Sequence, residues 1–196
     1  MSRLTPISKQ ECTPEQSKVI EAVTGGKRST QHGGKDFLAA DGAMRGPFNA
    51  MVHSPTLGLV LQRLGEILRY EGALEDDARE IAILVVAAHW QARYEWWAHA
   101  RIAREAGISD EVLDALARKQ APRPGTPLLK AVHSYASELV HDHRVSDATY
   151  AEASQALGES ALVELTIVLG YYTTISMILN AFAVPLPGGE STPFEC

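Results

Sequence analysis

Helix start signals recur along the whole chain, and they constrain its fold more than any other feature. A Ser or Thr followed directly by proline is typical of an N-cap with proline in the first helical turn. Such pairs lie at Thr13–Pro14, Ser54–Pro55 and Thr126–Pro127, and Ser109 and Ser146 each precede an Asp. No convincing run of alternating polar and apolar residues indicates a strand. The sequence therefore predicts an all-α fold, a helical bundle.

Apolar residues between these signals recur at helical spacing and give the expected helix bounds. The glycine-rich stretch at residues 25–45 has no sustained period and is expected to be a loop. The helix that follows Asp76 and Asp77 is apolar on nearly all sides, so it should lie in the core and break between His89 and Arg93. The expected helices span residues 14–25, a short turn within 46–55, 55–70, 76–89, 95–106, 110–119, 127–141, 147–157 and 160–182.

Length and composition indicate a single globular domain over residues 1–196. We expect an N-terminal helix and glycine-rich arm at residues 1–45, a helical core at 46–187 and a tail at 188–196. The net charge of −6 argues against nucleic acid and anionic membranes as partners. No run of about 18 apolar residues predicts a membrane span. The opening residues lack the apolar segment of a signal peptide, so a cytoplasmic location is expected.

Cysteines and metal-ligand patterns offer little chemistry. Cys12 and Cys196 lie at opposite ends of the chain and are expected to be free thiols in a reducing compartment. No cysteine lies between them, which excludes a CxxC redox pair and a cysteine-ligated metal there. The tract of His141, Asp142 and His143 resembles a metal site, but adjacent positions diverge on a helix. We therefore expect a helix C-terminal cap and no metal.

Acids, imidazoles and aromatic rings gather in an apolar region between Glu80 and His99. Burying such proton-transfer groups is costly and indicates chemistry. Glu95 and His99 are four residues apart and share a helix face, on which Ala92 leaves room for a ligand. If the preceding helix packs antiparallel, Glu80 can reach His99 and orient its imidazole. The alternative is an exposed Glu95–His99 pair with a solvated Glu80.

The segment AREIAILVVAAHWQARYEWWAHARIAREAGIS at residues 78–109 resembles the core of the carboxymuconolactone decarboxylase and alkylhydroperoxidase D-like superfamily. The similarity extends to GPFNAMVHSP before it and to HRVSDATY, ELTIVLGYYT and LNAF after it, over about residues 44–187. The resemblance implies an alkylhydroperoxidase D-like bundle of helical hairpins in a homo-oligomer, whether dimer, trimer or hexamer. Glu80 in ALEDDAREIAILVV and Glu164 in ALGESALVELTIVL align at an offset of 84 residues, either as a duplicated helical pair or by chance.

The peroxidase branch of that superfamily uses a Glu, a CxxC pair and a His four residues after the second cysteine. The matching positions in this sequence are Glu80, Ala92, Glu95 and His99. Ala92 and Glu95 cannot form or exchange a disulfide, so the resemblance favours the decarboxylase branch, which does not depend on that pair. It also implies no cofactor and no metal, because the carbonyl of a lactone substrate can accept the electrons.

A decarboxylase needs a group that protonates carbon after carbon dioxide leaves. His99 is the expected general acid or base, and Glu80 is its orienting partner. Glu95 or Tyr94 is expected to supply a second proton or hydrogen bond. Arg93, beside Tyr94, is the preferred candidate to bind a substrate carboxylate, although such an arginine is more often a surface charge.

Five further residues are candidates for substrate binding or for purely structural roles. Asn49 and His53 lie four apart and could line the pocket, or Asn49 could bond the backbone at a loop-to-helix junction. Trp96 and Tyr171 could contact substrate or fill the core. A buried Asn180 would need polar partners, which a pocket offers.

The sequence thus predicts a cofactor-independent acid–base enzyme, a carbon–carbon lyase that resembles 4-carboxymuconolactone decarboxylase. Its expected substrate is a small carboxylated lactone or a related intermediate of aromatic catabolism. One alternative is a non-enzymatic, oligomeric ligand-binding protein. A peroxidase-type oxidoreductase is a further alternative, which the missing cysteine pair disfavours.

Overall fold

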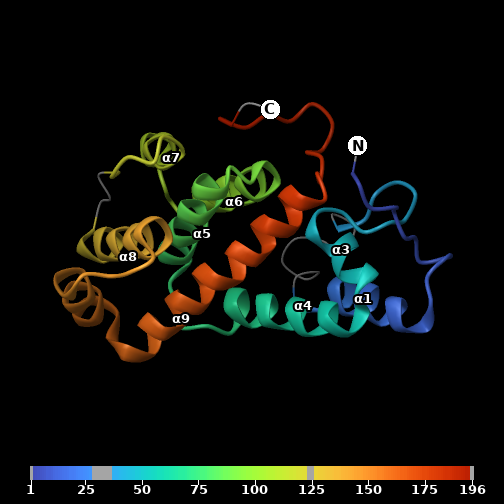
Figure 1. Cartoon of the computed structure of the whole chain (residues 1–196), viewed down its shortest axis with the longest axis horizontal. Helices are drawn as coiled ribbons and strands as arrows, with labels where there is room; N and C mark the ends of the chain where they lie inside the picture. The colour runs from blue at the N-terminus through green and yellow to red at the C-terminus, as the bar shows by residue number, and fades with distance from the viewer. Residues whose placement is uncertain (1, 28–36, 123–125, 195–196) are drawn as a thin grey trace. The chain divides into compact units, whose positions relative to one another are not determined.

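The computed structural model describes residues 2–27, 37–122 and 126–194 (Figure 1). Helices dominate these residues, and the extended pairing among them is limited to the isolated bridges Ser8–Ala43 and Leu38–Met44. The predicted all-α class is therefore confirmed. Two compact units are present, one of residues Met1–Gly72 and Ile178–Pro185 and the other of Ala73–Met177 and Leu186–Cys196.

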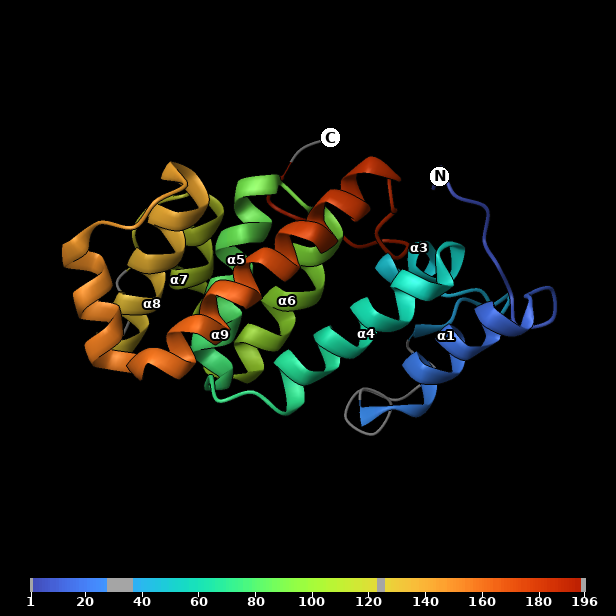
Figure 2. The same cartoon turned by 60° about the horizontal axis from the view of Figure 1, so that its bottom comes forward.

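The first unit contains α1 (Pro14–Gly25), α3 (Pro47–His53) and α4 (Pro55–Tyr70). The predicted N-cap of α1 is part of a capping box: the Gln16 backbone N–H donates to Thr13 Oγ1, and the Thr13 N–H donates to Gln16 Oε1. α1 packs against both α3 and α4 (Figure 2). Gly58 permits the close contact of α3 and α4, because a Cβ there would lie 2.2 Å from the carbonyl oxygen of Met51.

The apolar residues of α4, which recur at helical spacing, do not form a simple core face. Leu57 and Val60 are 70% and 68% exposed, whereas Gln62 and Glu66 are buried. The buried carboxylate of Glu66 accepts hydrogen bonds from the backbone N–H of Lys27 and from the Arg63 guanidinium. These bonds offset the cost of removing the acid from water, which hydrophobic periodicity alone does not register.

The second unit contains α5 to α8, the π-helix η2 and most of α9. α5 packs against α6, α7 and α8 (Figure 2), and it is buried without interruption from Ala78 to Ala88, as its apolar sequence predicts. The bounds are α5 Asp76–Trp90, α6 Arg93–Glu105, α7 Asp110–Ala117, α8 Pro127–Ser137, η2 Glu138–Asp142 and α9 Asp147–Ala181.

Helix ends in this unit lie close to the predicted positions. The break between α5 and α6 falls at Gln91, whose φ of 49° is left-handed. Ser109 and Thr126 cap α7 and α8 through their side-chain oxygens. Gly158 adopts φ 76° and ψ 163°, so α9 is interrupted where the sequence predicts one helix to end and the next to begin. The expected helix over 127–141 differs, since α-helical geometry gives way to a π-helix after Ser137.

By length and composition alone, α9 qualifies as a membrane-spanning helix among the described residues, and half of its most apolar window is buried inside the protein. Burial of this kind is also typical of a core helix in a globular protein.

Candidate active site around His99

The turn before α5 is held by side chains that fix where this helix begins. Glu164 of α9 accepts hydrogen bonds from the backbone N–H groups of Ala73 and Leu74, at 2.7 and 3.3 Å. The guanidinium of Arg79, itself buried, donates to the carbonyl oxygen of Leu74 at 2.9 Å and pairs with Asp76. Glu164, which aligns with Glu80 in the internal repeat, thus anchors a loop, whereas Glu80 faces a histidine.

α5 and α6 form a hairpin that brings Glu80, Glu95 and His99 together. Their side chains come from the second turn of α5 and the first two turns of α6, and the exposed fractions of these residues are 0%, 3% and 6%. Glu80 and His99 lie at similar distances in sequence from the turn at Gln91, which is the arrangement of an antiparallel hairpin. The sequence-based expectation that Glu80 reaches His99 therefore matches the geometry, and the alternative of a solvated Glu80 does not.

Both nitrogens of the His99 imidazole face a carboxylate. Nδ1 lies 2.6 Å from Glu80 Oε2, and Nε2 lies 3.1 Å from Glu95 Oε1. Burial by itself would lower the pKa of His99, but the charges and hydrogen bonds of the two carboxylates outweigh it and raise the pKa to about 9. At neutral pH the imidazole is therefore protonated and donates to Glu80 and to Glu95. The cluster is set up as a buried proton donor flanked by two acceptors.

An aromatic ring packs on His99, and further aromatic pairs lie on α6 and α9. Tyr172 of α9 meets the His99 ring edge to face at a centroid distance of 5.0 Å, and Tyr171 packs on Tyr172 at 5.1 Å. On α6, Trp96 is 5% exposed and packs edge to face on Phe194 of the C-terminal tail, at 5.2 Å. Low-polarity walls of this kind strengthen electrostatic interactions within the cluster.

The two other candidates on α6 point to different neighbours. The ring of Tyr94 packs against Trp97 at a centroid distance of 5.3 Å. The Nε of Arg93 donates to Thr192 Oγ1 on the C-terminal tail at 3.4 Å. Both side chains are half-buried. Their predicted roles in protonation and carboxylate binding stay predictions.

Asn49 and His53 belong to the first unit and bond the backbone of the N-terminal segment. Asn49 accepts from the N–H of Ile7 at 3.2 Å and donates to the carbonyl oxygen of Thr5 at 3.1 Å. His53 Nε2 lies 2.9 Å from the same carbonyl oxygen. This geometry is the structural alternative recognised in the sequence. Asn180, also in this unit, is exposed, so the argument from a buried amide is wrong for this residue.

Sequence patterns left Tyr172 and Phe194 out of the predicted site. Tyr172 stands beside the candidate Tyr171 in an apolar helix, and the ring that meets His99 depends on how α9 is rotated. Phe194 comes from a segment with no helical period. For Tyr172, its place in the resemblance motif ELTIVLGYYT was the available signal, whereas no signal indicated Phe194. Among the described residues, no group of three or more His, Cys, Asp or Glu side chains is arranged to hold a metal ion.

A comparison with known protein families matches part of the chain. Residues 55–138 match the model of the carboxymuconolactone decarboxylase family, a narrower span than the resemblance over 44–187. No curated protein matches the sequence.

Solved structures share the fold at low sequence identity. A peroxidase-related alkylhydroperoxidase AhpD core protein from Ralstonia eutropha is 15% identical in sequence and superimposes with a TM-score of 0.74. The match covers 95% of this chain and 93% of the Ralstonia chain. A putative antioxidant defence protein AhpD from Agrobacterium tumefaciens is also 15% identical, with a TM-score of 0.62 over 71% of this chain and 96% of its own.

The debrominase Bmp8, in a cysteine-to-alanine variant with bound 2,3,4-tribromopyrrole, is 12% identical with a TM-score of 0.71 over 96% of this chain and 95% of its own. At these identities the likeness shows the fold alone. Residues 55–138 of the chain therefore match the carboxymuconolactone decarboxylase family, and the chain shares the alkylhydroperoxidase D-like helical fold of these structures.

Proposed function

We propose that this protein is a cofactor-independent acid–base enzyme that removes carbon dioxide from a small carboxylated lactone or a related intermediate of aromatic catabolism. The observation that carries the proposal is the buried His99 imidazole held between Glu80 and Glu95, at 2.6 and 3.1 Å. A protonated imidazole with a pKa of about 9 is a proton reservoir at neutral pH. The substrate class comes from the resemblance to the carboxymuconolactone decarboxylase family.

The proposed reaction begins with cleavage of the bond between the ring carbon and the carboxylate. Carbon dioxide leaves, and the electron pair moves into the lactone carbonyl to give an enolate. The enolate carbon then takes a proton that passes from His99 Nε2 by way of Glu95 Oε1, and a proton from water restores the imidazolium. Glu80 fixes the ring through Nδ1 throughout, so it acts as a positioning residue.

Charge sets a requirement on substrate binding. Two carboxylates and one imidazolium give the cluster a net negative charge, which repels a carboxylate substrate. A cation must therefore meet the substrate, and Arg93, two residues before Glu95 on α6, is the proposed one. Its Nε donates to Thr192 Oγ1 at 3.4 Å, and a carboxylate would accept a stronger, charge-assisted hydrogen bond than this neutral hydroxyl does.

The proposal is tested by carbon dioxide release from γ-carboxymuconolactone. Removing a general acid costs about 10²- to 10⁴-fold in rate, so His99→Gln and Glu95→Gln should lower kcat by that order. Arg93→Met should raise KM more than it lowers kcat. His143→Gln and Glu152→Gln, at exposed positions, are matched controls that should retain wild-type turnover. Full activity in His99→Gln would show that the site is misassigned.

A non-enzymatic binding protein is the second candidate, and the closure of the cluster favours it. The His99 side chain is 7% exposed, and Phe194 covers the neighbouring Trp96. Equilibrium binding of the lactone without carbon dioxide release over a prolonged incubation would support this candidate over the lyase.

A cytoplasmic location and a homo-oligomeric state belong to the same proposal. The proposed chemistry needs neither a disulfide nor an oxidising compartment. Sedimentation equilibrium of the purified chain measures the oligomeric state, and a monomer at all concentrations would contradict that part of the proposal.

A further inference from the structure

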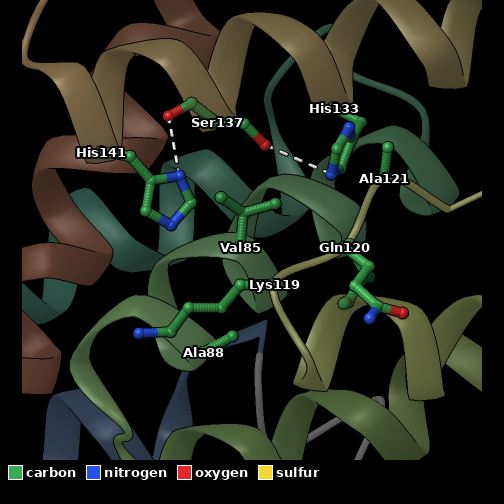
Figure 3. Close-up of a pocket in the computed structure, with 9 residues that line it drawn as sticks. Val85, Ala88, Lys119, Gln120, Ala121, His133, Ser137 and His141 are labelled. Atoms are coloured by element: carbon green, nitrogen blue, oxygen red, sulfur yellow. Dashed lines mark hydrogen bonds between the residues drawn. The ribbon is translucent and has the colours of Figure 1, made fainter.

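A second cluster of ionisable side chains surrounds a pocket elsewhere in the second unit. The pocket has a volume of about 230 Å³ and lies between α5, the segment after α7, and the α8–η2 helix. Figure 3 shows His133 and His141 on the α8–η2 side, Lys119 below them and Val85 between the two sides. None of these residues belongs to the Glu80–Glu95–His99 cluster.

The lining divides into an apolar part and a basic part. Val85, Ala88 and Leu116 supply apolar surface, while the polar lining includes Lys119 and the imidazoles of His133 and His141. No Asp or Glu belongs to the lining, although the chain as a whole carries a net charge of −6. Within the described residues, the Lys119 ammonium has no acidic partner.

The π-helix places the two imidazoles on one face. His133, Ser137 and His141 are spaced four residues apart, and in an α-helix each step would rotate the side chain by about 40°. The wider turn of η2 counteracts this rotation after Ser137, and His141 Nδ1 donates to the Ser137 carbonyl oxygen at 2.9 Å. The Ser137 hydroxyl lies 3.2 Å from His133 Nε2 (Figure 3). Single π-turns inside α-helices are frequent at functional sites.

Lys119 reaches the pocket from a backbone conformation that L-residues rarely adopt. Its φ is 54°, and the N–H groups of Lys119 and Gln120 bond back to Leu116 and Ala115 at the end of α7. Glycine is the usual residue at such a helix end, and a side chain there costs on the order of 1 kcal/mol.

We propose that this pocket binds a monocarboxylate with a small apolar body, its carboxylate at Lys119 and the imidazoles, and its apolar part against Val85, Ala88 and Leu116. The volume of about 230 Å³ has room for a body the size of one aromatic ring.

The neighbouring imidazoles make the binding dependent on pH. Burial, followed by the charge of His141, lowers the pKa of His133. Burial, followed by the charges of His141, Lys119 and His143, lowers the pKa of His89, whose ring lies 5.1 Å from that of His141. A bound carboxylate stabilises the protonated form of His133, so binding tightens as pH falls.

Titration calorimetry with benzoate tests the proposal on the full chain. Wild type should bind one benzoate, more tightly at about pH 6 than at about pH 8. Lys119→Met should weaken binding about fivefold, the effect of an exposed charge pair, and Lys119→Arg should restore it. Lys130→Met, at an exposed lysine of α8 outside the pocket, is the matched control and should bind as wild type does.

Three comparisons can overturn the proposal. Benzamide, which has the same shape without the charge, should bind about tenfold more weakly, and equal binding would contradict an anion site. Inorganic phosphate should bind more weakly than benzoate, and equal binding would contradict the apolar subsite. His99→Gln should leave benzoate affinity unchanged; loss of binding in this variant but not in Lys119→Met would place benzoate at the other cluster.

Discussion

At the scale of single residues, His99 owes its charge to two carboxylates. Glu80→Gln keeps the shape of the Glu80 side chain and removes its charge, so the pKa of His99 should fall from about 9 by about one unit or more. NMR titration of the imidazole measures this change. Glu152→Gln, on an exposed part of α9, is the control that should leave the titration unaltered. An unchanged pKa in Glu80→Gln would contradict the assigned contact.

The same imidazole makes folding stability depend on pH. The pKa of His99 is raised from 6.5 to about 9, so the folded chain holds a proton that the unfolded chain releases at lower pH. The stabilisation is therefore complete below pH 6.5, and it is lost as pH rises through about 9. A pKa difference of this size contributes on the order of 3 kcal/mol to the free energy of unfolding.

Urea unfolding at about pH 6 and at about pH 9.5 measures the loss. His99→Gln lacks the titrating group, so its free energy of unfolding should change much less over that interval. An equal change in the free energy of unfolding between the two pH values in wild type and in His99→Gln would contradict the expected contribution of His99.

Spacing in the sequence predicted the Glu95–His99 pair and its contact with Glu80, because both follow from helix periodicity and one short turn. It did not predict that Tyr172 would meet the imidazole, since that contact depends on the rotation of α9. The burial assumed for Asn180 was wrong for the same reason: an apolar helix does not reveal which of its faces is exposed.

At the scale of helices, Gly158 determines where α9 bends. Its φ of 76° and ψ of 163° are nearly exclusive to glycine, and a Cβ there would meet no atom within 4 Å. Gly158→Ala should therefore destabilise the protein by about 2 kcal/mol through backbone strain alone. Gly170, in the same helix with regular geometry and equally open space, provides the control.

Gly170→Ala should be neutral or stabilising by up to about 1 kcal/mol, because alanine favours a helix. Thermal or urea unfolding of the two variants compares the positions directly. Equal effects at both sites would show that the bend does not require glycine.

Helix ends could be predicted because caps act locally. Thr13, Ser109 and Thr126 each bond a backbone N–H within three residues, and no tertiary contact is needed for that. The π-helix after Ser137 and the buried Glu66 of α4 could not be predicted in this way. Glu66 is bonded by Lys27, 39 residues away in the sequence, and Glu138 of the π-helix bonds Ser146 and Thr149 beyond the helix end.

At the scale of the whole molecule, the residues at the two thiol positions of the resemblance argue against peroxidase activity. Cys12 is a free cysteine. Ala92 and Glu95 occupy the positions that thiols hold in the peroxidase branch. Hydroperoxide consumption with a dithiol reductant should therefore stay at background in wild type and in Cys12→Ser. Robust turnover in Cys12→Ser would refute this argument.

The uninterrupted burial of α5 has a consequence for how the protein opens. Amide hydrogens of Ala78 to Ala88 should exchange with solvent only when the whole unit unfolds, whereas those of the shorter, half-exposed α7 should exchange through local opening. Hydrogen exchange followed by mass spectrometry resolves the two regimes. Glu80 lies in the segment that is expected to exchange most slowly. The acid that orients His99 should therefore stay in its folded position during local unfolding elsewhere in the protein.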